Sequence, residues 1–395
     1  MLPRQMRVGM SSRVTVGHAM SAEQVRAGHP DKVCDQIADS ILDAFIEGAK
    51  SLGLPAAVAE QQRAAIEVLA KDTTVVLAGE VRVDVDVAKG IAYAEIVESV
   101  LTSVGYDASQ LRIIDLLGIQ QPELQASSDR RGAGDQGVMV GYATRESLSG
   151  MPIEHVYASS ICQVLDLHMR LPGFEWMRPD GKAQVTVNSA GRLQKIVVGV
   201  QHASDVGGTK FPSRIQKAIR EQVVEEILLP LLGPDVRTAD IVVNGSGSFA
   251  IGGPAGDAGV VGRKIVCDSY GPRVPIGGGA FSGKDPTKVD RTGAYMARMI
   301  AKAGLRESEK SQAVTARIAY AIGSRDPEML VVTDERGRDL SSWAARRFPD
   351  LAPVAIQERL DLWRHRSTAW SYAECARYGH FGRPGLPWEE QADDV

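Results

Sequence analysis

Strand-like and helix-like patterns alternate along this chain of 395 residues, and the alternation constrains the fold more than any other feature. Apolar residues recur every four positions over residues 31–45, which predicts a helix. Apolar and polar residues then alternate over 64–85 and predict strands, and residues 87–104 predict a second amphipathic helix. The first part of the chain therefore predicts a sheet with helices packed on one face.

The same alternation follows twice more, although the three passes do not align as a sequence repeat. The later helices are predicted at 151–171, 212–232 and 289–303, and the later strands at 183–187, 196–201, 241–243, 264–266 and 313–322. These patterns predict an α+β fold in which sheets are layered with helices on one face. Residues 118–137 are rich in glycine and polar residues and lack periodicity, so they are predicted to form a mobile loop.

The composition is that of an ordinary globular protein, with 44% hydrophobic and 24% charged residues. The net charge of −4 gives no overall basic field, so no nucleic-acid partner is predicted. No apolar run reaches about 18 residues, so no membrane span is predicted. Residues 1–17 contain arginines but no apolar segment, so we expect a tail and not a secretory signal, and a cytoplasmic location.

Two glycine-rich stretches near the middle of the chain end in or contain basic residues. The first covers 252–264 and ends in Arg263 and Lys264, and the second covers 277–291 and contains Lys284. Glycine lets a backbone approach a ligand and direct N–H groups toward it, while arginine and lysine add positive charge. Carboxylates within such stretches can hold a metal ion. Together the two stretches predict a site for a polyphosphate with magnesium.

The segment Gly28-His29-Pro30-Asp31-Lys32 stands at the start of the first predicted helix. Helix N-termini attract anions through unpaired N–H groups and the helix dipole. His29 can therefore meet a phosphate, and Asp31 can hold a metal ion. From these five residues alone, a simple cap turn with surface charge is the more frequent explanation.

Other polar positions carry weaker signals. Glu67 and Glu80 lie on adjacent predicted strands, where they either hold a cation or remain half-exposed. Residues 131–137 form a glycine turn that is typical of an ordinary loop, and Asp180-Gly181-Lys182 is typical of a hairpin. Phe249 can stack on a purine, although a core phenylalanine is the more frequent case.

Six segments taken together resemble the S-adenosylmethionine synthetase (methionine adenosyltransferase) family. They are residues 28–32, 132–137, 251–254, 262–264, 278–286 and 378–383, which follow the family's order, and the resemblance covers roughly residues 18–390. The resemblance implies three similar sheet-plus-helix domains around a pseudo-threefold axis. It also implies a homodimer or homotetramer with active sites between subunits. The corresponding division is a tail at 1–17, an N-terminal domain at 18–121, a gate loop and linker at 122–137, a central domain at 138–242 and a C-terminal domain at 243–395.

The implied reaction joins ATP and L-methionine to give S-adenosylmethionine. The thioether sulfur needs no general base and attacks the ribose 5′ carbon in line, and the triphosphate is then cleaved to pyrophosphate and phosphate. Catalysis by this route consists mostly of positioning and charge stabilisation.

The resemblance also assigns side chains to each part of this site. The implied catalytic residues are His29, Lys182, Arg263 and Lys284. The implied ATP-binding residues are His29, Asp180, Lys182, Phe249, Asp257, Arg263, Lys264, Ala280 and Lys284. The implied methionine-binding residues are Glu80, Gln120, Asp257 and Lys288. Asp31 and Asp290 are the implied ligands of two Mg²⁺ ions, and Glu67 is the implied ligand of K⁺.

The chain departs from the family pattern at several positions. Ser248 stands where the family has an arginine, Ile276 stands where a histidine is common, and Asp72 follows Lys71 where the family has threonine. Three alternatives to the standard activity therefore stay open. They are a divergent paralogue that uses methionine analogues, a non-catalytic paralogue that regulates a partner synthetase, and a magnesium-dependent polyphosphate hydrolase.

Overall fold

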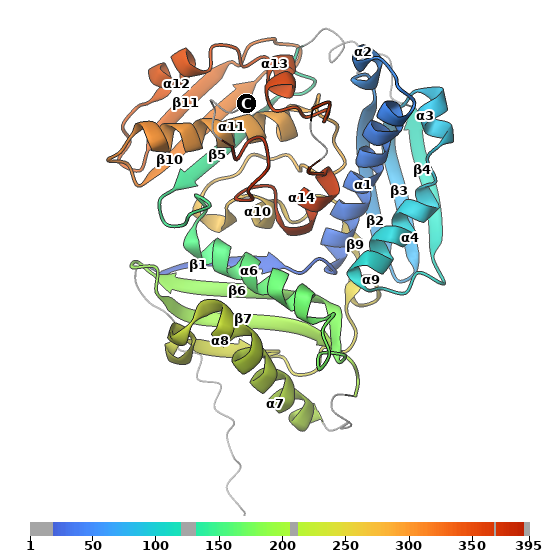
Figure 1. The fold of residues 1–395 in the computed structure, drawn as a ribbon, viewed down its shortest axis with the longest axis vertical. Coiled ribbons are helices and arrows are strands. Elements are labelled where there is room, and N and C mark those ends of the chain that lie inside the picture. The colour runs from blue at the N-terminus through green and yellow to red at the C-terminus, as the bar shows by residue number, and fades with distance from the viewer. Residues whose placement is uncertain (1–18, 120–131, 206–211, 367–368, 391–395) are drawn as a thin grey trace, which may run out of the picture.

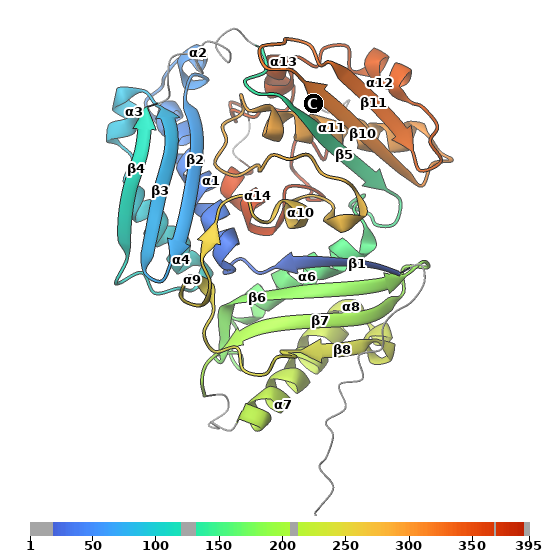
Figure 2. The same ribbon diagram turned by 180° about the vertical axis from the view of Figure 1, so that it is seen from behind.

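The computed structural model describes residues 19–119, 132–205, 212–366 and 369–390. Its strands form three sheets that stand around a shared centre, and helices cover one face of each sheet (Figure 1). Figure 2 shows the opposite faces of the three sheets, with the covering helices behind them. The predicted α+β fold of three sheet-plus-helix domains is therefore confirmed.

The first sheet has the strand order β4-β3-β2-β9. Its strands are β2 (Arg63–Lys71), β3 (Thr74–Arg82), β4 (Arg112–Ile119) and the short β9 (Gly259–Val260). The helices associated with it are α1 (Pro30–Ser51), α2 (Ala56–Ala59), α3 (Val85–Lys89) and α4 (Tyr93–Val104). The helix predicted over 87–104 is thus interrupted at residues 90–92.

The second sheet has the strand order β1-β6-β7-β8. Its strands are β1 (Ala19–Val25), β6 (Met177–Asn188), β7 (Leu193–His202) and β8 (Asp240–Val243). The helices on it are α6 (Ile153–His168) and α7 (Pro212–Gln222), and α7 continues through a π-helical segment, Val223–Leu228, into α8 (Leu229–Leu232). The predicted helix over 212–232 is confirmed, with a change of helical pitch inside it.

The third sheet has the strand order β11-β10-β5. Its strands are β5 (Gly137–Thr144), β10 (Ala313–Tyr320) and β11 (Met329–Asp334). Its helices are α11 (Val289–Glu307), α12 (Ser341–Arg347) and α13 (Pro353–Arg359). The centre between the three sheets holds the short helices α10 (Ile265–Asp268) and α14 (Tyr372–Tyr378), as Figure 1 shows.

Each sheet takes one strand from a distant part of the chain. β1 pairs with β6, β5 pairs with β10, and β9 pairs with β2, where Val260 lies opposite Leu69. The domain division at residues 121, 137 and 242 stays a prediction, and each sheet is completed by a strand from a distant part of the chain. The consequence for the site is that residues 251–264 cross from the second sheet to the edge of the first.

Two local predictions were wrong, and a third falls largely outside the described residues. Residues 264–266 were expected to be a strand, but Asp268 donates to the Lys264 carbonyl at 2.9 Å and closes the helical turn of α10. Asp180-Gly181 was expected at a hairpin, but it lies inside β6 at a bulge. A Cβ at position 181 would lie 2.4 Å from the Gly199 carbonyl oxygen, so glycine is required there for close approach. The predicted loop over 118–137 begins within β4 and ends at β5, and residues 120–131 lie outside the described residues.

α1 is the central helix of the molecule and is buried around most of its circumference. It contacts β2, β9, α4 and α14, so most polar residues in its first four turns are buried against other segments. None of the helices in the described ranges combines the length and the apolar character of a membrane span.

Candidate active site

The start of α1 brings together residues from the first predicted helix and from the first glycine-rich stretch. The His29 side chain caps α1, and its Nδ1 accepts a hydrogen bond from the Asp31 backbone N–H at 3.2 Å. One Asp31 carboxylate oxygen accepts from the Val260 N–H at 2.9 Å, and the other lies 2.7 Å from Lys264 Nζ. Arg263 approaches the same carboxylate at 3.4 Å. We call His29, Asp31, Arg263 and Lys264 the helix-start cluster.

The protonation states of this cluster follow from its surroundings. Burial and the charge of Lys264 lower the pKa of His29 to about 4, so its ring is neutral at neutral pH. Because Nδ1 accepts a hydrogen bond, the single ring proton lies on Nε2 and is available to a ligand. Burial acts to raise the pKa of Asp31, but the hydrogen bonds from Lys264 and Val260 lower it. The cluster therefore offers one neutral donor, one carboxylate and two cations.

Residues 252–264, which we call the strap, pass closely over the start of α1. A Cβ at position 259 would lie 2.2 Å from the Pro30 carbonyl oxygen, so only glycine permits this approach. Nearer its beginning, the strap is held by Asp180, which accepts from the Gly253 N–H at 2.7 Å. Burial raises the pKa of Asp180, and the charge of Asp257 acts in the same direction. The strap thus brings Asp180 and Asp257 to the same region as the helix-start cluster.

A cavity of about 470 Å³ lies next to the strap and is lined by Glu67, Ala280, Lys284 and Asp290, together with Gly262 of the strap. We call the first four residues the cavity cluster. The Lys284 ammonium forms an ion pair with the Asp290 carboxylate in the first turn of α11. Burial and the nearby Glu80 raise the pKa of Glu67, while Lys284 acts in the opposite direction. The second glycine-rich stretch therefore does bring a cation and a carboxylate to a cavity.

The two clusters lie beside different parts of β2. Val260 pairs with Leu69, whereas Lys284 forms an isolated bridge with Ala65. These two points are four residue steps apart on the strand, which corresponds to ~13 Å. One chain thus carries two neighbouring groups of predicted site residues and not a single ring of them.

The residues that are predicted to bind methionine are more widely separated. Glu80 pairs with Ala65 near one end of β2, while Asp257 is exposed on the strap, which contacts Lys71 at the other end of β2. Residues 65 to 71 span ~20 Å of strand. The Lys288 ammonium is bound to the buried Asp285 carboxylate at 2.9 Å, and Gln120 lies outside the described residues.

Lys182 and Phe249 lie on the second sheet and its exit. Lys182 pairs with Val25 across β1 and β6, its ammonium lies 3.8 Å from Glu23, and its charge contributes to lowering the pKa of His29 after burial and Lys264. Phe249 is half-buried, and its backbone is fixed on both sides by His202. Ser248, at the position of the missing arginine, is exposed.

The donor set fits magnesium that is shared with phosphate oxygens. Within the described ranges, no three acidic, histidine or cysteine side chains are grouped closely enough to cage a metal ion. Asp31 and Asp290 instead stand singly, each beside a lysine. Mg²⁺ commonly takes one or two carboxylates and completes its shell with water and substrate phosphates. Single aspartates beside lysines that could bind a phosphate are therefore suitable ligands, whereas a cage made by the protein alone is not present in these ranges.

Comparison with known proteins gives a consistent answer along nearly the whole chain. Residues 17–119 match the N-terminal domain of S-adenosylmethionine synthetase, residues 130–249 match its central domain, and residues 251–390 match its C-terminal domain. The chain belongs to the S-adenosylmethionine synthetase family. This membership makes it an enzyme of the methionine adenosyltransferase class, a transferase.

Relatives within the S-adenosylmethionine synthetase family are similar over nearly their full length. The S-adenosylmethionine synthase of Wolinella succinogenes is 41% identical, over 94% of this chain and 95% of its own. Those of Leifsonia xyli and Salinibacter ruber are each 38% identical over 95% of this chain, and over 97% and 96% of their own. The predicted resemblance is confirmed.

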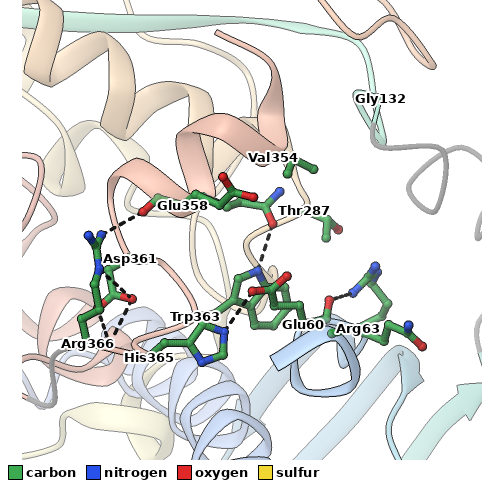
Figure 3. Close-up of a pocket in the computed structure, with 13 residues that line it drawn as sticks. Glu60, Arg63, Gly132, Thr287, Val354, Glu358, Asp361, Trp363, His365 and Arg366 are labelled. Carbon is green, nitrogen blue, oxygen red and sulfur yellow. Dashed lines mark hydrogen bonds and ion pairs between the residues drawn. The ribbon is translucent and has the colours of Figure 1, made fainter. Parts of the chain in front are cut away.

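A larger cavity, of about 580 Å³, lies apart from these clusters between α2 and the segment that follows α13 (Figure 3). Its polar side chains are bound to one another: His365 lies 3.0 Å from Glu60, and the Trp363 indole donates to Gln357 at 2.9 Å. Arg366 donates to the Glu358 carbonyl at 2.8 Å. None of the predicted site residues lines it. Volume alone therefore does not identify the active site of this synthetase-family chain.

Sequence reasoning missed two buried aspartates beside these clusters, Asp35 and Asp39 on α1. Asp35 accepts from the Gly262 N–H at 2.8 Å, and Asp39 accepts from the Gly283 N–H at 2.9 Å. The available signal was their helical spacing from Asp31, because charged residues at every fourth position of a buried helix need partners.

Proposed function

We propose that the chain makes S-adenosylmethionine from ATP and L-methionine, with Mg²⁺ and K⁺ as cofactors. The observation that carries the proposal is the helix-start cluster, in which a strap of glycines brings two cations to a histidine and an aspartate at a helix N-terminus. The helix end, the cations and the Nε2–H of His29 all favour a polyanion. Membership of the S-adenosylmethionine synthetase family supports the triphosphate of ATP as that polyanion.

The chemistry asked of the protein is mainly stabilisation of a leaving triphosphate. The methionine sulfur forms a bond to the ribose 5′ carbon as the bond from that carbon to the triphosphate oxygen breaks. The electron pair of the broken bond leaves with the triphosphate. His29 donates a hydrogen bond from Nε2 toward the leaving oxygen, and Arg263, Lys264, Lys284 and Lys182 bind the phosphates. Asp180, Phe249 and Asp257 hold the nucleoside, and Ala280 lines the phosphate site.

The metals and methionine are assigned in the same way. Asp31 and Asp290 would each hold one Mg²⁺, which neutralises charge that develops on the phosphates. Glu67 would hold K⁺, with Glu80 beside it as a second source of negative charge. Glu80, Gln120, Asp257 and Lys288 would bind methionine.

The separation of these residues along β2 supports an active site shared by two chains. Glu80 and Asp257 are assigned to one small substrate, yet in one chain they lie toward opposite ends of a nine-residue strand. The face of the first sheet that carries Glu67 and Glu80 also exposes Leu69 and Leu116. An exposed apolar sheet face is suited to a homodimer that brings the two ends together.

A single assay tests the activity and separates it from its alternatives. Purified protein is incubated with ATP, MgCl₂ and KCl, with and without methionine, and S-adenosylmethionine, phosphate and pyrophosphate are quantified. We expect the sulfonium product only with methionine. Phosphate release without methionine and without sulfonium would indicate the polyphosphate hydrolase instead. Folded protein without either product, which changes the rate of an active synthetase on mixing, would indicate the regulatory paralogue. Faster turnover of methionine analogues than of methionine would indicate the divergent paralogue.

A mixing experiment tests the shared site. The assay is run with Mg²⁺ far below the concentration that the variants require, so that Asp31→Asn impairs the helix-start cluster and Asp290→Asn impairs the cavity cluster. If a site takes one cluster from each chain, mixed dimers regain one intact site of two. A random mixture then recovers about a quarter of the wild-type rate. A mixture no more active than either variant, although subunit exchange is demonstrated by mass spectrometry, would place both clusters of a site in one chain.

A further inference from the structure

α1 carries an aspartate at every fourth position from its first turn: Asp31, Asp35, Asp39 and Asp43. All four are buried, and all four accept hydrogen bonds from backbone N–H groups of segments far away in the sequence. Residues four apart lie on one face of a helix, so the carboxylates form a row along α1. The row therefore anchors several loops to one rigid element.

Asp35 anchors the end of the strap. Its Oδ1 accepts from the Gly262 N–H at 2.8 Å, and Gly262 immediately precedes Arg263 and Lys264. Its Oδ2 lies 3.0 Å from the buried Lys32 ammonium, which also lies 2.5 Å from Asp268. The strap is thus tied to α1 by a carboxylate that is itself fixed by a buried cation.

Asp39 anchors the second glycine-rich stretch in the same manner. Its Oδ1 accepts from the Gly283 N–H at 2.9 Å, and Gly283 immediately precedes Lys284. The same oxygen pairs with the fully buried Arg291 guanidinium, which also donates to the Phe281 carbonyl. Both loops that carry phosphate-binding cations are therefore held, one residue before the cation, by neighbouring aspartates of one helix.

We propose that Asp35 and Asp39 are positioning residues, which fix Arg263, Lys264 and Lys284 for the triphosphate without touching it. The proposal rests on the proposed function of those cations. Lysine and arginine side chains are long and flexible, so their placement depends on the backbone that carries them. A displacement of about 1 Å at a catalytic group can cost about 100-fold in rate.

Asp43 supplies a matched control on the same row. It accepts from the Tyr372 and Ala373 N–H groups at 3.1 and 2.9 Å and pairs with Arg364 at 2.8 Å. The segment that it holds contains none of the proposed site residues. Arg364 also lies 2.9 Å from Glu47, as Lys32 also lies beside Asp268. Asp35→Asn and Asp43→Asn therefore each remove one buried carboxylate while the cation retains a second acid.

The experiment compares these two variants with the wild type by thermal unfolding, by kcat and KM for ATP, and by the affinity for inorganic tripolyphosphate with Mg²⁺. We expect both to lower Tm. Asp35→Asn should lower kcat by about 10- to 100-fold and weaken tripolyphosphate binding. Asp43→Asn should leave both within about twofold of the wild type, per folded protein. Equal effects of the two variants on kcat and binding would overturn the positioning role.

Asp39 needs a different variant, because Asp39→Asn alone leaves the Arg291 charge buried without an acid. The double variant Asp39→Asn/Arg291→Gln removes both charges. If the double variant folds and binds tripolyphosphate as tightly as the wild type, Asp39 does not position the cation. Binding of tripolyphosphate is measured without turnover, so it also separates the two proposals. Weaker binding by Asp35→Asn alone supports positioning even if the wild type makes no S-adenosylmethionine.

Discussion

The starts of α1 and α6 both hold a buried acid–base pair, but they differ in the side-chain cap and in the segment that crosses them. Each helix has an acid in its first turn, Asp31 or Glu154, and the two are 2% and 1% exposed. Each acid pairs with a basic residue that comes after residue 250 in the sequence. Asp31 pairs with Lys264, and Glu154 pairs with Arg273. A buried acid beside a cation at a helix start is therefore a recurrent structural feature of this fold.

What distinguishes α1 is the cap and the strap. His29 caps α1 with its side chain, whereas α6 begins after Pro152 without a side-chain cap. The backbone of the strap also donates to Asp31, and Arg263 beside it is about half exposed, so a ligand can reach the cations. The comparison indicates that a buried acid–base pair at a helix start contributes to stability. A hydrogen-bond donor and accessible cations beside the pair make it suited to binding an anion.

The largest expected effect comes from removing the cap. His29→Ala should lower kcat by about 100- to 1,000-fold, because it removes the donor that we propose acts on the leaving oxygen. The KM for ATP should change far less, since the cations remain. Steady-state kinetics with ATP and methionine measure both. Parallel losses in kcat and affinity would show that His29 only binds ATP, and the comparison with α6 would lose its main distinction.

The acid of α1 should show a magnesium effect that the acid of α6 lacks. Asp31→Asn should raise the Mg²⁺ concentration required for half-maximal rate by about tenfold, because a metal ligand loses its charge. Asp290→Asn should behave in the same way. Magnesium titrations at saturating ATP measure the shift. Unchanged titrations in both variants would remove these aspartates from the metal sites.

Glu154→Gln should affect stability and leave turnover almost unchanged. Breaking a fully buried ion pair costs about 3–5 kcal/mol, and the loss is smaller here because Arg273 also pairs with Glu146. Thermal unfolding should show a lower Tm, while kcat per folded protein stays within about twofold. A loss of turnover as large as that of Asp31→Asn would make the two helix starts equivalent.

The smallest effect concerns pH, and both helices should show it. Burial lowers the pKa of His155 in α6 to about 4, and burial with Lys264 lowers that of His29 to about 4. The unfolded chain binds these protons near pH 6.5 and the folded chain only near pH 4. Stability is therefore full above about pH 6.5 and is lost as the pH falls toward 4.

The variant His155→Leu should flatten that loss by about one proton, as measured by urea unfolding at several pH values. His29→Ala should flatten it similarly, in addition to its effect on kcat. An unchanged pH slope in His155→Leu would mean that this histidine takes up its proton equally in both states.

The parts predicted well from the sequence are those with local causes. The helix over 31–45 and the strands over 64–85 follow from apolar periodicity. Burial of one face of a helix or strand requires apolar residues at the spacing of that element. The strands at 19–25 and 137–144 were missed, because their pairing partners lie far along the chain and their sequences contain small and polar residues. Lys264 was predicted to lie in a strand because its neighbours are apolar, but it stands at the start of α10, where its carbonyl accepts the Asp268 N–H that closes the helical turn.

Recognition of the site depended on motifs, whereas its support did not. His29, Arg263 and Lys284 stand in segments whose residue types suggest phosphate binding on their own. Asp35 and Asp39 look like ordinary helix residues until the loops that they hold are placed. The separation along β2 of the predicted methionine-binding residues likewise follows from strand register, which a single sequence does not specify.

The exchange of strands between the sheets has a consequence for synthesis on the ribosome. Ala19 of β1 pairs with Asn188, so the first strand to emerge has no partner until β6 has been translated. At about 5–20 residues per second, that wait lasts many seconds. β5 waits in turn for β10, and β2 waits for β9. The nascent protein therefore carries unpaired strand edges for most of its translation, and such edges are sites where another chain can pair.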